Sequence, residues 1–166
     1  MLTNNFRRCA ISQAFSNTQY YLYYIDMNGD DAAGGNFMTI KTLFSCIASV
    51  PLATLDTSVE KGTLIFGSSD VAEGATDYNL KSIIDDTLFT RGTTSYTNSS
   101  YQNVDGTITL VQTATYTGAE PCTIKEVGYA VRYSAIPRPM LIAREVLKQP
   151  ITVNQGDTFT VSMVIQ

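Results

Sequence analysis

The chain has 166 residues, of which 44% are hydrophobic, and a formal net charge of −4 from 11 basic and 15 acidic residues. This length suffices for one domain with a hydrophobic core and is short for two. Charged residues make up only 16%, so other side chains must cover much of the surface, and the chain has 22 Thr and 10 Tyr. Because Thr and Tyr favour pleated, half-buried surfaces, the composition favours β structure.

Composition also argues against several classes of function. Basic residues do not cluster beyond Arg7-Arg8, and a protein that binds nucleic acid needs a basic face, so we expect no nucleic-acid partner. The absence of His removes the usual proton shuttle and all Ser-His and Cys-His pairs. No apolar run approaches the length of a membrane span, and no signal peptide is visible, so we expect no membrane partner.

The three cysteines, Cys9, Cys46 and Cys122, lie far apart without the spacing of metal ligands. We expect three reduced thiols, although the sequence leaves one disulfide open. We expect no cofactor and no metal.

In chain order, residues 1–18 are mixed and polar and predict an N-terminal arm, so that residues 19–166 would form a single β-sandwich domain. The aromatic run 20–25 predicts a strand, and Asn28-Gly29 predicts a tight turn after it. Residues 37–40 follow as an apolar segment. The apolar run 41–50 fits a short helix or a strand, since periodicity does not decide over so short a run.

Further strands are predicted over 63–66, 83–89, 107–117, 122–133, 140–147 and 158–166, with an exposed polar loop over 91–106. A change of parity within 122–133 predicts either a bulge near Lys125-Glu126 or an inward-pointing Glu126. Phe159, Val161 and Met163 alternate with polar residues, as in an antiparallel strand with one wet face. The spacing of these short strands predicts an all-β fold, an antiparallel β-sandwich or barrel.

Three groups of charged residues are candidate sites. The acidic turn 26–31 resembles the start of a calcium loop, but it lacks the glycine and glutamate positions of an EF-hand, so we interpret it as a hairpin turn. Asp85-Asp86 would point to opposite faces of a strand and could not act as a dyad. Glu126 and Arg144 are charges within apolar strands, and buried charges need partners, so we predict a structural ion pair between neighbouring strands.

Tyrosines are the candidates for an assembly surface, because Tyr is enriched at protein interfaces. The strand 20–25 supplies four, which could also belong to the core or bind a sugar or an aromatic partner. The polar loop supplies two that could instead bind a glycan. The candidates are Tyr20, Tyr21, Tyr23, Tyr24, Tyr96 and Tyr101.

Segments of the C-terminal third resemble a known group of proteins. The segments are 123–129 (TIKEVGY), 141–147 (LIAREVL) and 150–158 (PITVNQGDT), with 66–70 (FGSSD) and 77–80 (DYNL) upstream. They are similar to a block in small virion proteins of tailed bacteriophages, of the podophage type that includes crAss-like phages. The resemblance covers about half of the chain. It implies a jelly-roll-like β-sandwich that forms homo-oligomers or decorates a shell or ring, and it carries no catalytic residues.

The leading hypothesis is therefore a non-enzymatic structural component of a virion, a capsid accessory, collar or ring, or tail protein, assembled in the host cytoplasm with other virion proteins. The first alternative is a carbohydrate- or receptor-binding β-sandwich of a phage fibre. The second is a glycan hydrolase, which needs two carboxylates in a cleft that the sequence does not mark.

Overall fold

A computed structural model describes residues 1–14, 21–35, 52, 61–98, 108–133 and 136–165. Most of them lie in antiparallel β-strands with little helix, which confirms the all-β prediction. Predictions for 37–40 and 41–50 concern residues outside these ranges. In chain order the elements are α1 (Asn4–Ala14), β1 (Tyr21–Ile25), β2 (Asp31–Gly35), β3 (Lys61–Gly67), the 3₁₀ helix η2 (Asp86–Leu88), β4 (Phe89–Asn98), β5 (Ile108–Tyr116), β6 (Cys122–Tyr133), β7 (Ile136–Val153) and β8 (Thr158–Ile165).

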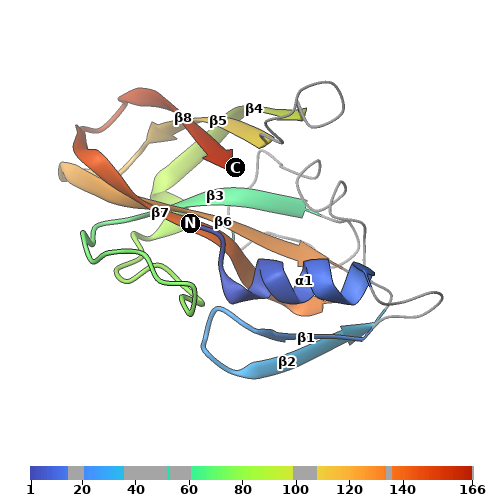
Figure 1. The fold of residues 1–166 in the computed structure, drawn as a ribbon. Coiled ribbons are helices and arrows are strands. Elements are labelled where there is room, and N and C mark those ends of the chain that lie inside the picture. The colour runs from blue at the N-terminus through green and yellow to red at the C-terminus, as the bar shows by residue number, and fades with distance from the viewer. Residues whose placement is uncertain (15–20, 36–51, 53–60, 99–107, 134–135, 166) are drawn as a thin grey trace.

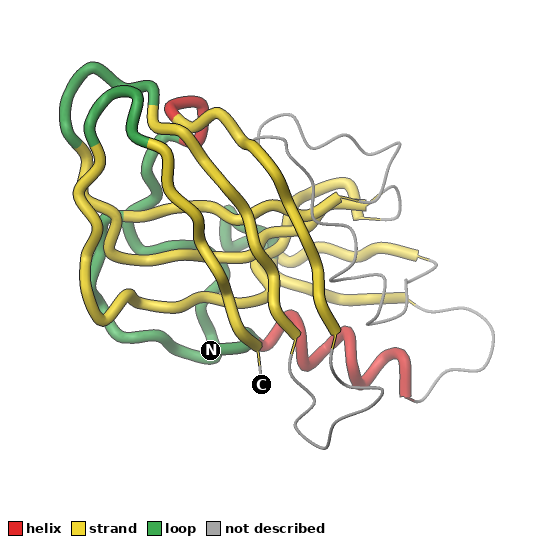
Figure 2. The backbone as a smooth tube through the Cα atoms, turned by 90° about the horizontal axis from the view of Figure 1, so that it is seen from above, coloured by secondary structure: helices red, strands yellow, loops and turns green. Residues whose placement is uncertain are grey.

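The strands form a hairpin, β1–β2, and two three-stranded antiparallel sheets with the orders β3–β6–β7 and β4–β5–β8 (Figure 1). The strands of the two larger sheets run across one another when seen from above (Figure 2). Both sheets contribute side chains to one apolar core, in which the rings of Phe66 and Phe89 meet edge to face at 4.8 Å between centroids. Members of this core include Leu64, Phe66, Val127, Tyr129 and Ile142 from the first sheet and Phe89, Leu110, Ala114, Val161 and Met163 from the second.

The N-terminal residues differ from the predicted arm. Residues 4–14 form α1, which contacts β1 and β7, and Cys9 is fully buried. The Asn5 side chain accepts a hydrogen bond from the Ile25 N–H and donates one to the Ile25 carbonyl, so it ties the helix to the end of β1. Phe6 and Cys9 are three positions apart on one face of the helix, and both contribute to the core.

Two predicted boundaries in the middle of the chain are wrong. Residues 83–88 are not a strand, and β4 begins only at Phe89: Ile83 makes one isolated bridge to Gly67, and Asp85 then caps η2 by accepting from Thr87 N–H. The predicted polar loop is the strand β4 as far as Asn98, and residues 99–106 lie outside the described part. Its Thr and Ser residues belong in a strand because one face of the β4–β5–β8 sheet is open to solvent.

Strand β7 is longer than the predicted 140–147. It includes Pro137, Pro139 and Pro150, which lie outside the predicted range. Proline cannot donate to a ladder but is tolerated on an edge strand, and β7 is the edge of its sheet. Strands β3, β5, β6 and β8 agree closely with the predicted ones.

Candidate functional site

The ion pair expected from the sequence forms across β6 and β7. Arg144 Nε lies 2.7 Å from Glu126 Oε2, and both side chains are almost completely buried. The pairing register shifts between Ile124 and Glu126, so the predicted bulge forms. Ile124 and Val127 both face the shared core, and Glu126 lies on the opposite face of the sheet, so the alternative of an inward-pointing Glu126 is wrong. Glu126 packs directly against Gly67 of β3, where a Cβ atom would collide with its carboxylate.

A third charged residue, Asp77, completes this network. Arg144 Nη1 donates to Asp77 Oδ2 at 3.0 Å and to the Ala72 carbonyl, and Nη2 donates to the Val71 carbonyl at 2.7 Å. All three guanidinium nitrogens therefore have partners. Sequence reasoning missed Asp77, because no spacing in the chain relates it to β6 or β7.

Arg144 binds the beginning of the segment 71–82, and Glu126 binds its end. Its carboxylate accepts hydrogen bonds from the N–H groups of Lys81, at 3.2 Å, and Ser82, at 2.9 Å. Glu73 accepts one from Val146 N–H at 2.7 Å. The network thus fastens residues 71–82 onto the face of the β3–β6–β7 sheet that points away from the shared core. We call this set, Glu73, Asp77, Lys81, Glu126 and Arg144, the charge network.

Burial and hydrogen bonding oppose one another at Asp77. Burial alone would raise the pKa of this carboxyl, but hydrogen bonds from Lys81, the Gly74 N–H and Arg144 lower it below its ordinary value. Lys81 Nζ lies 2.7 Å from Asp77 Oδ1 and is partly exposed. The carboxylate is therefore held ionised by groups of the fold itself, and its role is structural.

The acidic turn 26–31 is a hairpin turn, as predicted, between β1 and β2. Asp26 Oδ1 accepts from the N–H groups of Asn28 and Asp30, its Oδ2 accepts from Arg138 at 2.9 Å, and Gly29 has φ 89°. Although burial raises the pKa of Asp26, Arg138 and the turn N–H groups lower it overall. Within the described ranges, no group of three or more His, Cys, Asp or Glu is placed to hold a metal ion.

A second buried pair, Asp86 and Arg91, was not anticipated. Arg91 Nη2 contacts Asp86 Oδ1, and the guanidinium carbon lies 4.5 Å from the centroid of the Phe66 ring. Burial lowers the pKa of Arg91, against the opposite effect of Asp86. Unlike the guanidinium of Arg144, that of Arg91 has two nitrogens, Nε and Nη1, without hydrogen-bond partners. Asp85 is exposed at the cap of η2, so the two adjacent acids have separate roles.

Of the tyrosine candidates, Tyr24 is fully buried, and its hydroxyl donates to the Arg138 carbonyl at 3.2 Å, so it belongs to the core rather than to a surface. The backbones of Tyr21, Tyr23 and Tyr96 lie in β1 and β4, but their side chains are outside the description, as are Tyr20 and Tyr101 entirely. Cys9 and Cys122 are free thiols, and burial raises the pKa of Cys9 to about 12. Cys46 lies outside the described residues.

The outward face of the β4–β5–β8 sheet has a different character. Its described side chains are small and uncharged, and neighbouring hydroxyls meet across the strands: Thr115 with Thr158 at 2.8 Å, and Thr113 with Thr160 at 3.4 Å. We call this surface the hydroxyl face; it consists of Thr90, Gly92, Ser95, Thr109, Val111, Thr113, Thr115, Thr158, Thr160, Ser162 and Val164.

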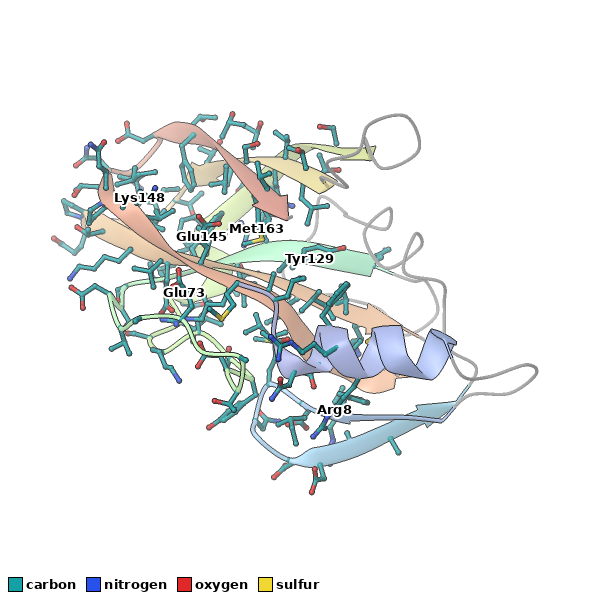
Figure 3. All side chains as sticks on the ribbon, in the orientation of Figure 1. Arg8, Glu73, Tyr129, Glu145, Lys148 and Met163 are labelled. Atoms are coloured by element: carbon teal, nitrogen blue, oxygen red, sulfur yellow. The ribbon has the colours of Figure 1, made fainter. Side chains whose placement is uncertain are left out.

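A hollow of about 120 Å³ opens at the C-terminal end of β8. Leu2, Glu145, Met163 and Val164 are among the residues that line it, and Figure 3 labels Glu145 and Met163 where β7 and β8 approach each other. The hollow lies beside the outer edge of the β4–β5–β8 sheet.

Comparison with known proteins gives no relative: no family model matches the sequence, and neither a curated protein nor a solved structure matches it. Among the described residues, no helix is long and apolar enough to cross a membrane.

Proposed function

We propose that the protein is a non-enzymatic structural subunit that acts through protein–protein contacts, and that it is a component of a bacteriophage virion. The virion assignment rests on the resemblance of residues 123–129, 141–147 and 150–158 to a block in small virion proteins of tailed bacteriophages. Its partners would be other virion proteins of the capsid, neck or tail, together with further copies of the chain, joined in the host cytoplasm.

The proposal includes a β-sandwich architecture. Supporting it, the two larger sheets share one core, and the chain passes from one sheet to the other between β3 and β4, β5 and β6, and β7 and β8. The hairpins β4–β5 and β6–β7 each stay within one sheet. A jelly-roll-like relation is proposed from the resemblance alone.

The observation that carries the assembly role is the hydroxyl face. Charged residues are depleted at the cores of protein interfaces, because burying them requires desolvation. The described part of this face has no charged side chain, although it includes solvent-exposed positions on two strands. A hydroxyl both donates and accepts, so such a face can be covered by a protein partner without leaving a charge unpaired.

Two measurements test the proposal. Mass spectrometry of virions purified from the phage that encodes the chain should find it at a stoichiometry typical of a structural component. Light scattering after size exclusion should find a defined oligomer or reversible larger assemblies. Absence from purified virions would overturn the virion assignment.

The alternative, a glycan- or receptor-binding module, makes a separate prediction. It requires exposed aromatic side chains, for which the sequence offers Tyr96 and Tyr101. Glycan-array binding that is lost on Tyr101→Ala, with a monomeric protein in solution, would favour this alternative.

A further inference from the structure

The edges of the two larger sheets differ in how they are covered. The edge of β7 is paired by the N-terminal residues: Thr3 N–H donates to the Ile142 carbonyl at 2.9 Å and Arg144 N–H to the Met1 carbonyl at 3.0 Å. An isolated bridge joins Leu2 to Ala143. This edge is therefore occupied over part of its length by the chain itself.

The other edge of that sheet, β3, and the edge β4 of the second sheet are also interrupted. The Ile84 N–H donates to the Phe66 carbonyl at 2.9 Å, so the segment before η2 covers the end of β3. Strand β4 has a register shift between Arg91 and Thr94. Covering segments and bulges are ordinary means by which proteins prevent strands from pairing with another molecule.

Within the described ranges, strand β8 shows none of these protections. Its sequence, TFTVSMVI, contains no charged residue, Pro or Gly, and its register with β5 runs without a shift. No other described strand pairs with its outer edge. Val164 is 46% exposed. A long, uncharged and unbulged edge would promote aggregation if it stayed uncovered.

The backbone groups at this edge follow from the register. Tyr116 N–H donates to the Asp157 carbonyl at 2.9 Å, and the Tyr116 carbonyl accepts from Gly156 N–H at 2.8 Å, so the Asp157 carbonyl points toward β5 where the β5–β8 ladder begins. Alternation then directs the N–H and C=O groups of residues 159, 161, 163 and 165 toward β5. Those of residues 158, 160, 162 and 164 point to the free edge.

We propose that β8 pairs with β8 of a second copy of this chain, antiparallel about a twofold axis, to join two β4–β5–β8 sheets into one continuous sheet. The inference rests on the proposed function as an assembly subunit and names its interface. A second copy is the occupant because a twofold interface requires self-complementarity. The edge meets this requirement because β8 itself is uncharged, so the same uncharged residues would stand on both sides of the axis.

Pairing would also extend both surfaces of the sheet. Phe159, Val161 and Met163 point toward the core, so their counterparts would continue the apolar side. Thr158, Thr160 and Ser162 would continue the hydroxyl face across the axis. The core and the hydroxyl face would therefore run through the interface without a change of character.

The test compares Ser162→Lys with Thr90→Lys. Both substitutions place one lysine at an exposed position of the hydroxyl face, but only Ser162 lies on β8, whereas Thr90 lies on the opposite edge strand. Sedimentation velocity over a range of concentrations should find a dimer for the wild type and for Thr90→Lys. Ser162→Lys should raise the dissociation constant by at least about tenfold, the equivalent of about 1.4 kcal/mol.

Amide hydrogen exchange supplies a second measurement. The amides of residues 158, 160, 162 and 164 should be protected in the wild-type dimer and should exchange quickly in Ser162→Lys. Ser162→Pro should also weaken the dimer and speed exchange at these amides. It removes the Ser162 N–H, which points to the free edge, so it breaks no hydrogen bond to β5. Thermal unfolding establishes that each variant is folded.

The inference is overturned if the wild type stays monomeric with fast exchange at these four amides, or if Thr90→Lys weakens association as much as Ser162→Lys. The latter result would indicate pairing through the hydroxyl face instead of the edge. A monomer that is nevertheless stoichiometric in purified virions would refute the β8 interface and leave the proposed function intact. A β8-paired dimer that is absent from virions would refute the virion assignment and leave the β8 interface intact.

Discussion

The outward faces of the two three-stranded sheets carry opposite kinds of side chain. On the β3–β6–β7 sheet, Glu126 and Arg144 are buried under residues 71–82 and use their hydrogen-bonding capacity to hold that segment. On the β4–β5–β8 sheet, hydroxyls and small apolar groups remain at the surface. The charged face is thus closed by the chain itself, whereas the described residues of the uncharged face stay exposed to solvent.

The difference shows where charge is useful in this fold. A buried ion pair contributes little net stability over an apolar replacement, but removing one partner is strongly destabilising. Such a network makes the placement of a long irregular segment specific. A surface that a partner covers gains from the opposite composition, because no charge must be desolvated when the partner binds.

The largest effect is expected from removing the centre of the charge network. Arg144→Met leaves the carboxylates of Glu126 and Asp77 buried without their guanidinium partner. We expect a loss of about 3–5 kcal/mol in the free energy of unfolding, measured by urea denaturation. The control is Lys125→Ala. Lys125 lies beside Glu126 on β6 and forms a solvent-exposed ion pair with Asp70, so its removal should change the free energy of unfolding little. Equal effects of the two variants would contradict the assigned role of Arg144.

A smaller effect is expected at the second buried pair, because its arginine is incompletely satisfied. Two guanidinium nitrogens of Arg91 have no hydrogen-bond partner. Replacing Arg91 therefore removes fewer favourable interactions than replacing Arg144. The double variant Asp86→Asn with Arg91→Met should therefore be within about 1–2 kcal/mol of the wild type, in either direction. The matching variant Glu126→Gln with Arg144→Met should be clearly less stable, since it abandons the bonds to Val71 and Ala72. The reverse order of stabilities would show that partner count does not distinguish the two pairs.

Acid should weaken the charge network through Asp77. Its pKa is lower in the folded protein than its ordinary value of 3.8, so the folded state binds the proton less readily than the unfolded state. The stabilisation is therefore complete above about pH 4 and is lost as the pH falls through the lowered pKa. Urea midpoints measured from neutral to strongly acidic pH should fall less steeply for Asp77→Asn than for the wild type.

Asp26 provides the comparison for that titration. Its pKa is also lowered, by Arg138 and the turn N–H groups against burial, so Asp26→Asn should flatten the same acid limb. If Asp77→Asn leaves the acid limb unchanged while Asp26→Asn flattens it, the hairpin rather than the charge network controls acid stability.

Local patterns predicted one part of this structure well. The alternation of Phe159, Val161 and Met163 was enough to place β8, because the period of a strand is contained in the strand itself. The pairing of Glu126 with Arg144 followed from two charges within apolar runs. Neither inference needed knowledge of the rest of the chain.

The features that were missed depend on contacts distant in sequence. Asp77 reaches Arg144 because residues 71–82 fold back on β7, and the Arg91 guanidinium packs against Phe66 of β3. The helix α1 carried a signal, since Phe6 and Cys9 are spaced as on one helical face, but its polar composition favoured an arm. In each case tertiary packing decided the outcome.

The smallest effect is expected on the hydroxyl face. Thr115 and Thr158 lie opposite each other on β5 and β8, with their hydroxyls 2.8 Å apart at the exposed surface. Thr115→Val removes one hydroxyl while keeping the β-branched shape, and should change the free energy of unfolding by no more than about 0.2–1 kcal/mol, as cross-strand pairs generally do. A double-mutant cycle with Thr158→Val measures the coupling. A coupling comparable to that of Arg144 and Glu126 would mean that the hydroxyls stabilise the fold itself, and would remove the reason for regarding this face as a surface kept for a partner.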